Sequence, residues 1–331
     1  IGPDDWTPAS GTMTPGLGYI VLGKGSTIPF NSNATYLSTL LPSYEAIFTG
    51  GKFNNGLTEV VVKEDDYNND ITGVGTDGNK DWNLNLNFVG NPYPSAIDIA
   101  KFFQGNSGVL NNSLYVWTHD VPITTNFGPN AYDFNNLSFI TVNYNPTLQE
   151  VTQVASSTNK TLSSFNIASG QGFMVSVVND IAANTKVKFN NGMRVTGNNN
   201  TFYKTQETSI DRLWLNMTGT DVFRQLAVAF HESSSDMFIS GEDTPKIDSA
   251  DDTDFYSLAQ NNIGHLAIQF LGAFEESKQV PIGVEINQAG SYSIELSYHE
   301  GIFTEGQKIY LEDTYEDVIH NLNEGAYSFT Q

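Results

Sequence analysis

Short runs of alternating apolar and polar residues, rich in β-branched and aromatic side chains, recur along the whole chain. Gly and Asn, which favour turns, separate one run from the next. Because side chains two residues apart share one face of a strand, this alternation predicts strands joined by tight turns, an all-β fold. The expected strands are residues 18–22, 57–62, 82–89, 113–117, 172–177, 186–189, 212–217, 225–230, 266–270, 280–286, 291–296 and 308–311.

Only one stretch has the pattern of a helix, directly after Pro94. Ser95 is the expected N-cap, and Asp98 stands three residues later, as in a capping box. The apolar face would come from Ala96, Ile97, Ala100, Phe102 and Phe103. We therefore expect a single short helix.

Charge divides the chain into two parts. Residues 1–203 carry 9 Lys and Arg against 15 Asp and Glu, whereas residues 204–331 carry 6 against 22. Arg212 opens a new strand after this change, in which Leu213, Leu215 and Met217 alternate with Trp214, Asn216 and Thr218. We expect two β-sandwich or jelly-roll-like domains, residues 1–203 and residues 204–331, the second strongly acidic.

Two short elements occur twice in the first domain. Residues 16–21 (GLGYIV) are similar to residues 170–175 (GQGFMV), and the FNNG of residues 53–56 is repeated at 189–192. Each copy predicts a glycine turn that leads into a strand, followed by a strand that ends in an Asn-Gly hairpin turn. The first domain would then hold two pseudo-equivalent β units; the alternative is a chance match in a Gly- and Asn-rich chain.

The chain of 331 residues has a formal net charge of −22 and contains no cysteine. Such a surface would repel nucleic acids and anionic lipid headgroups, because both are bound through Lys and Arg. Without cysteine there is no disulfide, thiolate nucleophile or cysteine-ligated zinc. No apolar run approaches the length of a membrane span, so we expect neither nucleic-acid binding nor membrane insertion.

The sequence motifs that mark common enzymes are not found. The Gly-x-Gly pairs at 16–18 and 170–172 complete neither a dinucleotide-binding motif nor a P-loop, and turn glycines explain them better. The five histidines are dispersed, and no GxSxG elbow occurs. We therefore expect a non-enzymatic protein; the alternative is a hydrolase whose groups meet only in the folded chain.

Three loops are rich in oxygen ligands, which calcium prefers. Residues 64–70 hold four acids and two Asn, and Asp77-x-Asn79-x-Asp81 matches the first three ligand positions of a calcium loop but lacks the glycine of an EF-hand. The richest loop contains Asp243, Asp248, Asp251, Asp252 and Asp254. Calcium is the cofactor that these loops predict, and solvated acidic loops are the alternative.

Aromatic residues gather in the first domain and could form a platform on which sugar rings stack. The candidates are Tyr93, Tyr115 and Trp117, with Tyr132 and Tyr144 further along. The alternative is that these rings fill the core of a β-sandwich, which needs many aromatic side chains.

The segment V-G-N-P-Y-P-S-A-I-D at residues 89–98 is accompanied by other motifs in one order along nearly the whole chain. These are residues 82–84, 114–119, 167–173, 189–195, 212–216, 280–283, 309–313, 320–322 and 326–329. Together they resemble a β-rich module found near the C-terminus of secreted and surface proteins of the Bacteroidota, especially flavobacteria, which are exported by the type IX secretion system.

The resemblance implies an extracellular module of adhesins and gliding-type surface proteins, in which a C-terminal sorting domain follows. It supplies no catalytic motif. We therefore expect a structural or adhesive role at the cell surface, with contact to the type IX machinery through regions outside this chain and with an extracellular glycan or surface protein as partner. The alternative is a carbohydrate-binding accessory module of a larger secreted enzyme.

One further site follows from the resemblance. Asp248-Ser249-Ala250 is similar to the Asp-Ser/Thr-apolar acceptor of protein O-glycosylation in the Bacteroidota. Ser249 is therefore a candidate glycosylation site in an acidic loop, and an ordinary loop serine is the alternative.

Overall fold

The computed structural model describes residues 11–19, 52–64, 85–118, 139–195, 210–247, 253–260 and 265–331. Strands dominate its regular structure, and the described residues contain one α-helix, α1 (Ile99–Gly105). Two short 3₁₀ turns accompany it, η3 (Asn191–Met193) and η4 (Gly301–Glu305). The predicted all-β class with one short helix is confirmed.

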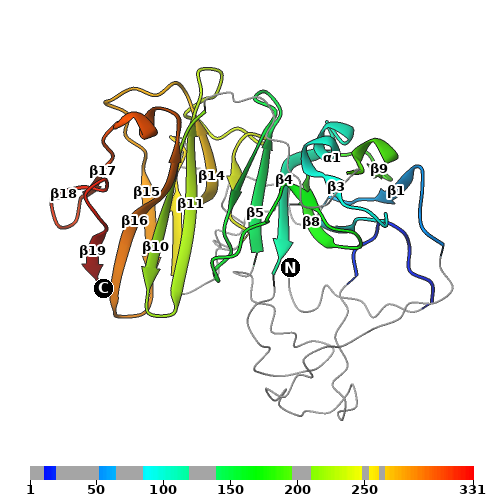
Figure 1. Cartoon of the computed structure of the whole chain (residues 1–331), viewed down its shortest axis with the longest axis horizontal. Coiled ribbons are helices and arrows are strands. Elements are labelled where there is room, and N and C mark those ends of the chain that lie inside the picture. The colour runs from blue at the N-terminus through cyan, green and yellow to red at the C-terminus, as the bar shows by residue number, and fades with distance from the viewer. Residues whose placement is uncertain are drawn as a thin grey trace, which may run out of the picture.

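Strands from the first half form an antiparallel sheet of five strands at the centre of Figure 1. In spatial order they are β2 (Leu86–Gly90), β8 (Gly172–Val177), β4 (Leu110–Trp117), β5 (Phe139–Asn145) and β6 (Glu150–Val154). The predicted strand at 172–177 has these bounds, but β5 and β6 are not among the predicted strands. Buried Asn143 and Asn145 interrupt the apolar pattern of β5, which explains why it was missed.

Strands from the second half form an eight-stranded sheet, on the left in Figure 1. Only β11 and β14 run parallel to each other; the other pairs are antiparallel. In spatial order the strands are β15 (Ile282–Ile286), β13 (Thr253–Ser257), β14 (Leu266–Leu271), β11 (Val222–Phe230), β10 (Asp211–Gly219), β16 (Ser291–Glu300) and β19 (Tyr327–Thr330), with β12 (Thr244–Pro245) beside β14.

The alternation predicted for residues 212–217 places the two faces of β10 against different layers. Leu213, Leu215 and Met217 join an apolar cluster with Phe303 of η4 and with Leu311 on the outer face. β17 (Tyr310–Asp313) forms a hairpin with β18 (Val318–Asn321) there. The opposite face, with Trp214, packs toward the five-stranded sheet. The centre of the eight-stranded sheet is therefore covered on both sides.

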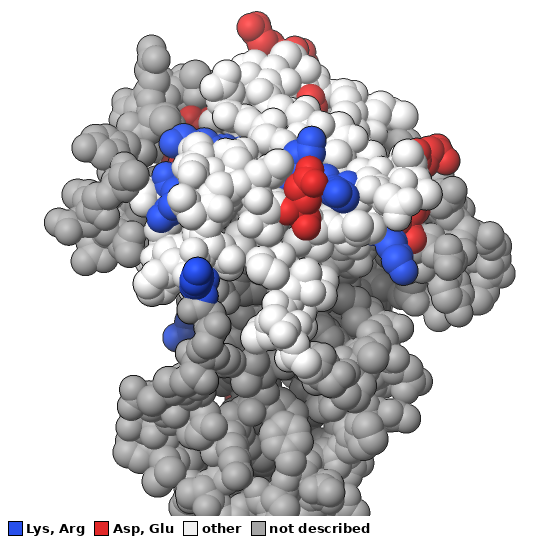
Figure 2. All heavy atoms as spheres, turned by 90° about the vertical axis from the view of Figure 1, so that its right-hand side faces the viewer, with Lys and Arg blue, Asp and Glu red and all other residues white. Residues whose placement is uncertain are grey.

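The layer on the right of Figure 1 covers the other face of the five-stranded sheet. It contains α1, the pair β1 (Thr58–Val61) and β9 (Lys186–Phe189), and the pair β3 (Ile97–Asp98) and β7 (Asn166–Ile167). Its core is aromatic, because the Phe102 ring lies 5.4 Å from Phe173 and 5.3 Å from Phe189 between centroids. Basic and acidic side chains are interspersed on its outer surface (Figure 2), and Lys186 Nζ lies 3.0 Å from Glu59 Oε2.

The predicted start of the helix is wrong. Asp98 is the N-cap of α1, and its side chain accepts a hydrogen bond from the backbone N–H of Lys101 (2.9 Å). Ile97 cannot be helical because it pairs with Ile167 in the β3–β7 ladder. Ser95 instead accepts a hydrogen bond from Arg194 Nε (2.9 Å).

The two copies of the first repeated element lie on the two sides of β2. Leu17 and Phe173 both pair with Val89 of β2, one from each edge of that strand. The glycine beside each of them leaves room for the Phe88 ring, with which a Cβ at either position would collide. Residues 20–22 of the expected strand at 18–22 lie outside the described residues.

The second repeated element does not form the expected hairpins. After β9, Asn190 Oδ1 accepts the N–H of Gly192 (2.8 Å), and the chain enters η3 instead of a hairpin turn. The other copy lies beside it, since Gly56 N donates to Asn191 Oδ1 (3.1 Å).

Side chains join the two large sheets along a line that we call the inter-sheet seam. At one end, Arg212 Nη1 donates to Thr152 Oγ1 and Trp214 Nε1 donates to the carbonyl of Gln153, both at 2.9 Å. Val154 completes an apolar cluster with Trp214 beside these bonds. The end of β6 is thus held against β10.

The other end of the seam lies at β12. Asn143 Nδ2 donates to the carbonyl of Glu242 (3.0 Å) and to Thr244 Oγ1 (2.9 Å). Tyr115 OH donates to the carbonyl of Pro245 (3.0 Å). The predicted domain boundary after residue 203 lies outside the described residues and stays a prediction, although strands before and after it belong to different large sheets.

We expect Asn143→Ala to destabilise the protein by about 1–3 kcal/mol, because the Glu242 carbonyl and the Thr244 hydroxyl lose their donor at the seam. Urea unfolding would measure the loss. Asn87→Ala is the matched control, since half-buried Asn87 bonds to the backbone of Lys63 away from the seam. An equal or larger loss in the control would contradict the importance of the seam.

Candidate functional site

The 89–98 motif and the 167–173 segment meet at Asn91, which is buried. Asn91 Nδ2 donates to the carbonyls of Ser95 (2.8 Å), Ile167 (3.2 Å) and Ala168 (3.0 Å). Asn91 Oδ1 accepts the N–H of Tyr93 (3.0 Å). All polar atoms of this amide therefore bond to the backbone of the motifs themselves.

Tyr93 and Arg194 bring the 189–195 segment into the same cluster. The Arg194 guanidinium lies over the Tyr93 ring, 5.4 Å from its centroid, and Arg194 Nη1 donates to Asn55 Oδ1 (3.2 Å). Tyr93 OH donates to the carbonyl of Gly56 (2.6 Å). We call Asn91, Tyr93 and Arg194 the motif cluster; it holds four chain segments together.

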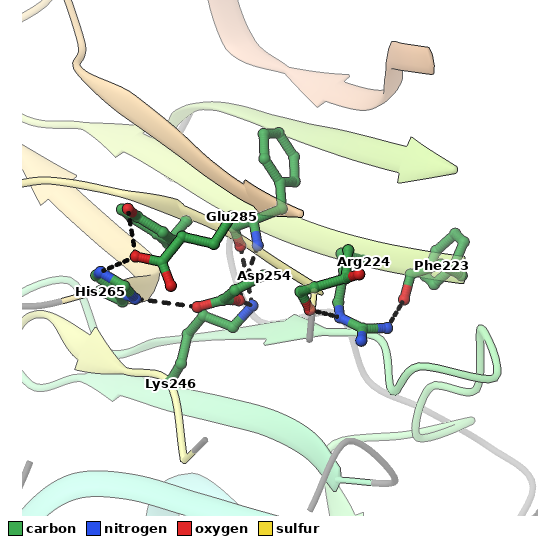
Figure 3. A network of polar contacts seen from close by, with 9 residues as sticks. Phe223, Arg224, Lys246, Asp254, His265 and Glu285 are labelled. Carbon is green, nitrogen blue, oxygen red and sulfur yellow. Dashed lines mark hydrogen bonds and ion pairs between the residues drawn. The ribbon is translucent and has the colours of Figure 1, made fainter. Parts of the chain in front are cut away.

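A second polar group, the Asp254 network, lies in the eight-stranded sheet and consists of Lys246, Asp254, His265 and Glu285 (Figure 3). Lys246 Nζ contacts Asp254 Oδ1, and His265 Nδ1 lies 3.0 Å from Asp254 Oδ2. The backbone N–H of Phe255 donates to Asp254 Oδ1 (2.7 Å). The side chains of Lys246 and Asp254 are only 12% and 5% exposed.

The imidazole of His265 is held on its other side as well. Its Nε2 lies 3.7 Å from Glu285 Oε1, and the Tyr256 ring stacks on it with a centroid separation of 3.4 Å. Gly283 permits this stack, because a Cβ there would collide with the Tyr256 ring.

Strand register explains why these residues meet. In the β13–β15 ladder Asp254 faces Glu285 and Tyr256 faces Gly283. The N–H of Lys246 donates to the carbonyl of His265 (2.9 Å), which joins the end of β12 to the start of β14. Lys246, His265 and Glu285 were not predicted as site residues, since their positions in the sequence give no sign of these pairings.

The charged groups of the network change the pKa values of Asp254 and Tyr256. Burial raises the pKa of Asp254, but Lys246 and His265 outweigh burial and lower that pKa to about 2. Burial and the neighbouring carboxylates of Glu285 and Asp254 raise the pKa of Tyr256 to about 12. In the ion-paired form Asp254 is therefore a carboxylate and Tyr256 a neutral phenol.

An Asp-His pair also occurs in hydrolase triads, where the second imidazole nitrogen activates a hydroxyl. In this protein that nitrogen, Nε2 of His265, faces the carboxylate of Glu285. Glu285 therefore lies on the side of the imidazole where a triad would have its hydroxyl.

A cleft between the two large sheets adjoins the network. Lys246 lines it together with Arg224 and Gln225 of β11, opposite Phe139 and Thr141 of β5. Arg224 Nε donates to the carbonyl of Thr253 (2.9 Å), which anchors the start of β13.

The structure describes two of the five predicted ligands in the 243–254 loop. Asp243 is buried and accepts the N–H groups of Ile239 and Phe270, both at 2.8 Å. Asp254 is held by Lys246 and His265. Within the described ranges, no three His, Asp or Glu side chains form a group that could hold a metal. The remaining candidates lie outside the described residues: Asp248, Asp251, Asp252, Asp77, Asn79, Asp81 and the glycosylation candidate Ser249.

The predicted aromatic platform is wrong for two of its three members. Tyr93 and Tyr115 are 1% and 0% exposed, so neither ring can stack on a sugar. Trp117 is half-buried at the end of β4, and its ring stacks on Phe139 with centroids 6.5 Å apart. These side chains fill the interior, as the alternative for an aromatic-rich β fold held.

The chain belongs to the family described as a domain of unknown function, DUF8693, whose model matches residues 2–331. No curated protein and no solved structure matches it. No helix in the described parts of the chain is long and apolar enough to cross a membrane.

The buried carboxyl group of Asp243 predicts that the stability of the protein depends on pH. Burial raises its pKa from 3.8 to about 7, despite the two N–H bonds to its carboxylate. Because the folded state then binds the proton more tightly, its stabilising contribution is complete below about pH 3.8 and is lost as the pH rises through about 7. From about pH 4 to pH 7 we expect the wild type to lose on the order of a few kcal/mol relative to Asp243→Asn.

Denaturant unfolding of both proteins across this pH range would measure the difference. The amide in Asp243→Asn has one hydrogen-bond acceptor fewer than the carboxylate. This loss changes the free energy of unfolding by the same amount at every pH, so it does not alter the dependence on pH. Asp221→Asn, at an exposed turn, removes the same charge and serves as the control. Parallel curves for the wild type and Asp243→Asn would refute the prediction.

Proposed function

We propose that this chain is a non-catalytic structural and adhesive module of a type IX-secreted protein at the bacterial cell surface. The observation that carries the proposal is the motif cluster. A residue that binds a substrate must direct polar atoms toward that substrate, whereas Asn91, Tyr93 and Arg194 use theirs to tie chain segments together. The motifs behind the resemblance thus serve the fold.

The inter-sheet seam supports the same proposal. Arg212, from another of those motifs, donates to Thr152 across the seam and pairs with Glu300 on its own sheet. Bonds of this kind make the two large sheets one block, and a block can transmit force between its neighbours in a surface protein. The secreted location, the bacterial origin and calcium in the acidic loops belong to the proposal and rest on the sequence.

Bead adhesion under flow tests this function. Beads coated with the purified full chain should be retained on surfaces coated with extracellular glycans or surface proteins, and the chain should release no reducing sugar or peptide from them. Albumin-coated beads are the control. Retention no better than albumin would refute adhesion, and product release that disappears in His265→Gln would refute the absence of catalysis.

A carbohydrate-binding accessory module is the second candidate, and the β17–β18 hairpin favours it. Tyr310 is 62% exposed and Tyr315, at the tip, is 92% exposed. Ile319, on β18, is 70% exposed beside them. Exposed tyrosines offer rigid apolar faces on which sugar rings can stack, with a hydroxyl for hydrogen bonds.

If this hairpin binds polysaccharide, the double variant Tyr310→Ala and Tyr315→Ala should lose most of the retardation seen in native gels that contain the polysaccharide. Phe53→Ala removes a ring that is 87% exposed in the first half and is the matched control. Equal retardation of the double variant and the wild type would exclude the hairpin as the binding surface.

A further inference from the structure

The Asp254 network brings an amine and a carboxylate into contact where water has little access. Lys246 Nζ contacts Asp254 Oδ1 and also donates to the carbonyl of Phe255 (2.9 Å), which fixes its direction. Lys246 directly follows β12 and Asp254 lies within β13, and both strands are anchored in the eight-stranded sheet. The amine and the carboxylate are thus held as neighbours by the fold.

We propose that Lys246 and Asp254 condense to form an intramolecular isopeptide bond. One proton passes from the ammonium to the carboxylate, which gives a neutral amine and a carboxylic acid. The lone pair of Nζ then forms a bond to Cγ of Asp254, and the bond from Cγ to Oδ2 breaks with its electron pair on the oxygen. That oxygen leaves as water with the protons of the acid and the amine, so no oxidant, cofactor or other reactant is needed.

The contacts of the two carboxylate oxygens suit this reaction. Oδ1, which remains as the amide oxygen, accepts the backbone N–H of Phe255 (2.7 Å), and this donor can stabilise the negative charge of the tetrahedral intermediate. Oδ2, which leaves, lies 3.0 Å from Nδ1 of His265, which can protonate it. Glu285 Oε1 lies 3.7 Å from the other imidazole nitrogen and helps to fix the direction of the ring.

Burial and proximity both favour the product. Two charges out of water carry a desolvation cost that a neutral amide does not, so condensation removes that cost. Groups held in contact also react as though at very high concentration, since the entropy of bringing them together has already been lost in folding. The reaction therefore requires the folded chain.

A second Lys-Asp pair in the same sheet region provides an internal comparison. Lys278 Nζ lies 2.6 Å from both oxygens of Asp236, and the two side chains are 17% and 24% exposed. The other donors to Asp236 are the N–H of Gly272 and the amide of Gln260, neither of which can supply a proton as an imidazole does. This pair should remain an ion pair.

Mass spectrometry of the denatured full chain tests the proposal. We expect the folded protein, after purification and incubation, to be lighter than its sequence mass by one water molecule. Trypsin should then yield residues 225–278 as one peptide that lacks one water, because Lys246 is the sole internal cleavage site in that range. Full mass, with separate peptides 225–246 and 247–278, would overturn the proposal.

Variants distinguish the isopeptide bond between Lys246 and Asp254 from other reactions that release water. Lys246→Arg keeps the charge but not the nucleophile, and it should show the full mass. Asp254→Asn should lose ammonia in place of water if the bond forms through the same carbonyl carbon. Lys278→Arg, the matched control, should lose water as the wild type does; full mass in that variant would place the modification at the wrong lysine.

His265→Gln tests the proton transfer. It should fold, as circular dichroism would verify, yet form the bond at least tenfold more slowly during incubation after refolding. If the bond forms at the wild-type rate in this variant, the imidazole has no part in the reaction, and the assigned chemistry is wrong.

Discussion

The structure depends on the burial of the eight-stranded sheet on both faces. β10 and β11 place leucines and Phe230 on one side, under η4 and the β17–β18 hairpin, and Trp214 with small alanines on the other. Because water reaches neither face at the centre, each polar group there needs a partner from the adjoining layer. The inter-sheet seam supplies those partners: the indole of Trp214 bonds to the backbone of β6, and the guanidinium of Arg212 bonds to Thr152.

The same constraint explains why charges gather around Asp254. A chain with a formal charge of −22 can leave most of its carboxylates in water, so burial of one needs a local reason. Here the β13–β15 register places Asp254 inside, and Lys246 and His265 provide the compensating groups. Removal of one partner would leave an uncompensated buried charge, whereas joining amine and carboxylate would remove both charges at once. Structural stability and chemical reactivity therefore come from one arrangement.

Sequence reasoning succeeded where one physical signal acted alone. The strands at 172–177 and 186–189 are found with their observed bounds, the first as a continuous apolar run after a turn glycine and the second by alternation of lysine with apolar residues. It failed at β5, whose buried Asn143 serves the seam, and at the helix start, where pairing of Ile97 with Ile167 overrides the cap that Ser95 could have formed. The Asp254 network depends on pairings among four strands, and single-chain patterns do not encode which strands become neighbours.

The motif cluster shows that a family resemblance allows the fold of a chain to be inferred but not its ligand. Asn91 and Tyr93 lie in the 89–98 motif and Arg194 lies in the 189–195 motif, and each of them bonds to the backbone or side chains of another segment. Such residues define a fold, because replacing any of them leaves buried polar groups without partners. They carry no information about a ligand, since their polar atoms are already used. Differences of function among chains of this kind should therefore be sought on exposed elements such as the β17–β18 hairpin and in the loops between strands, which can change without disturbing the motif cluster or the seam.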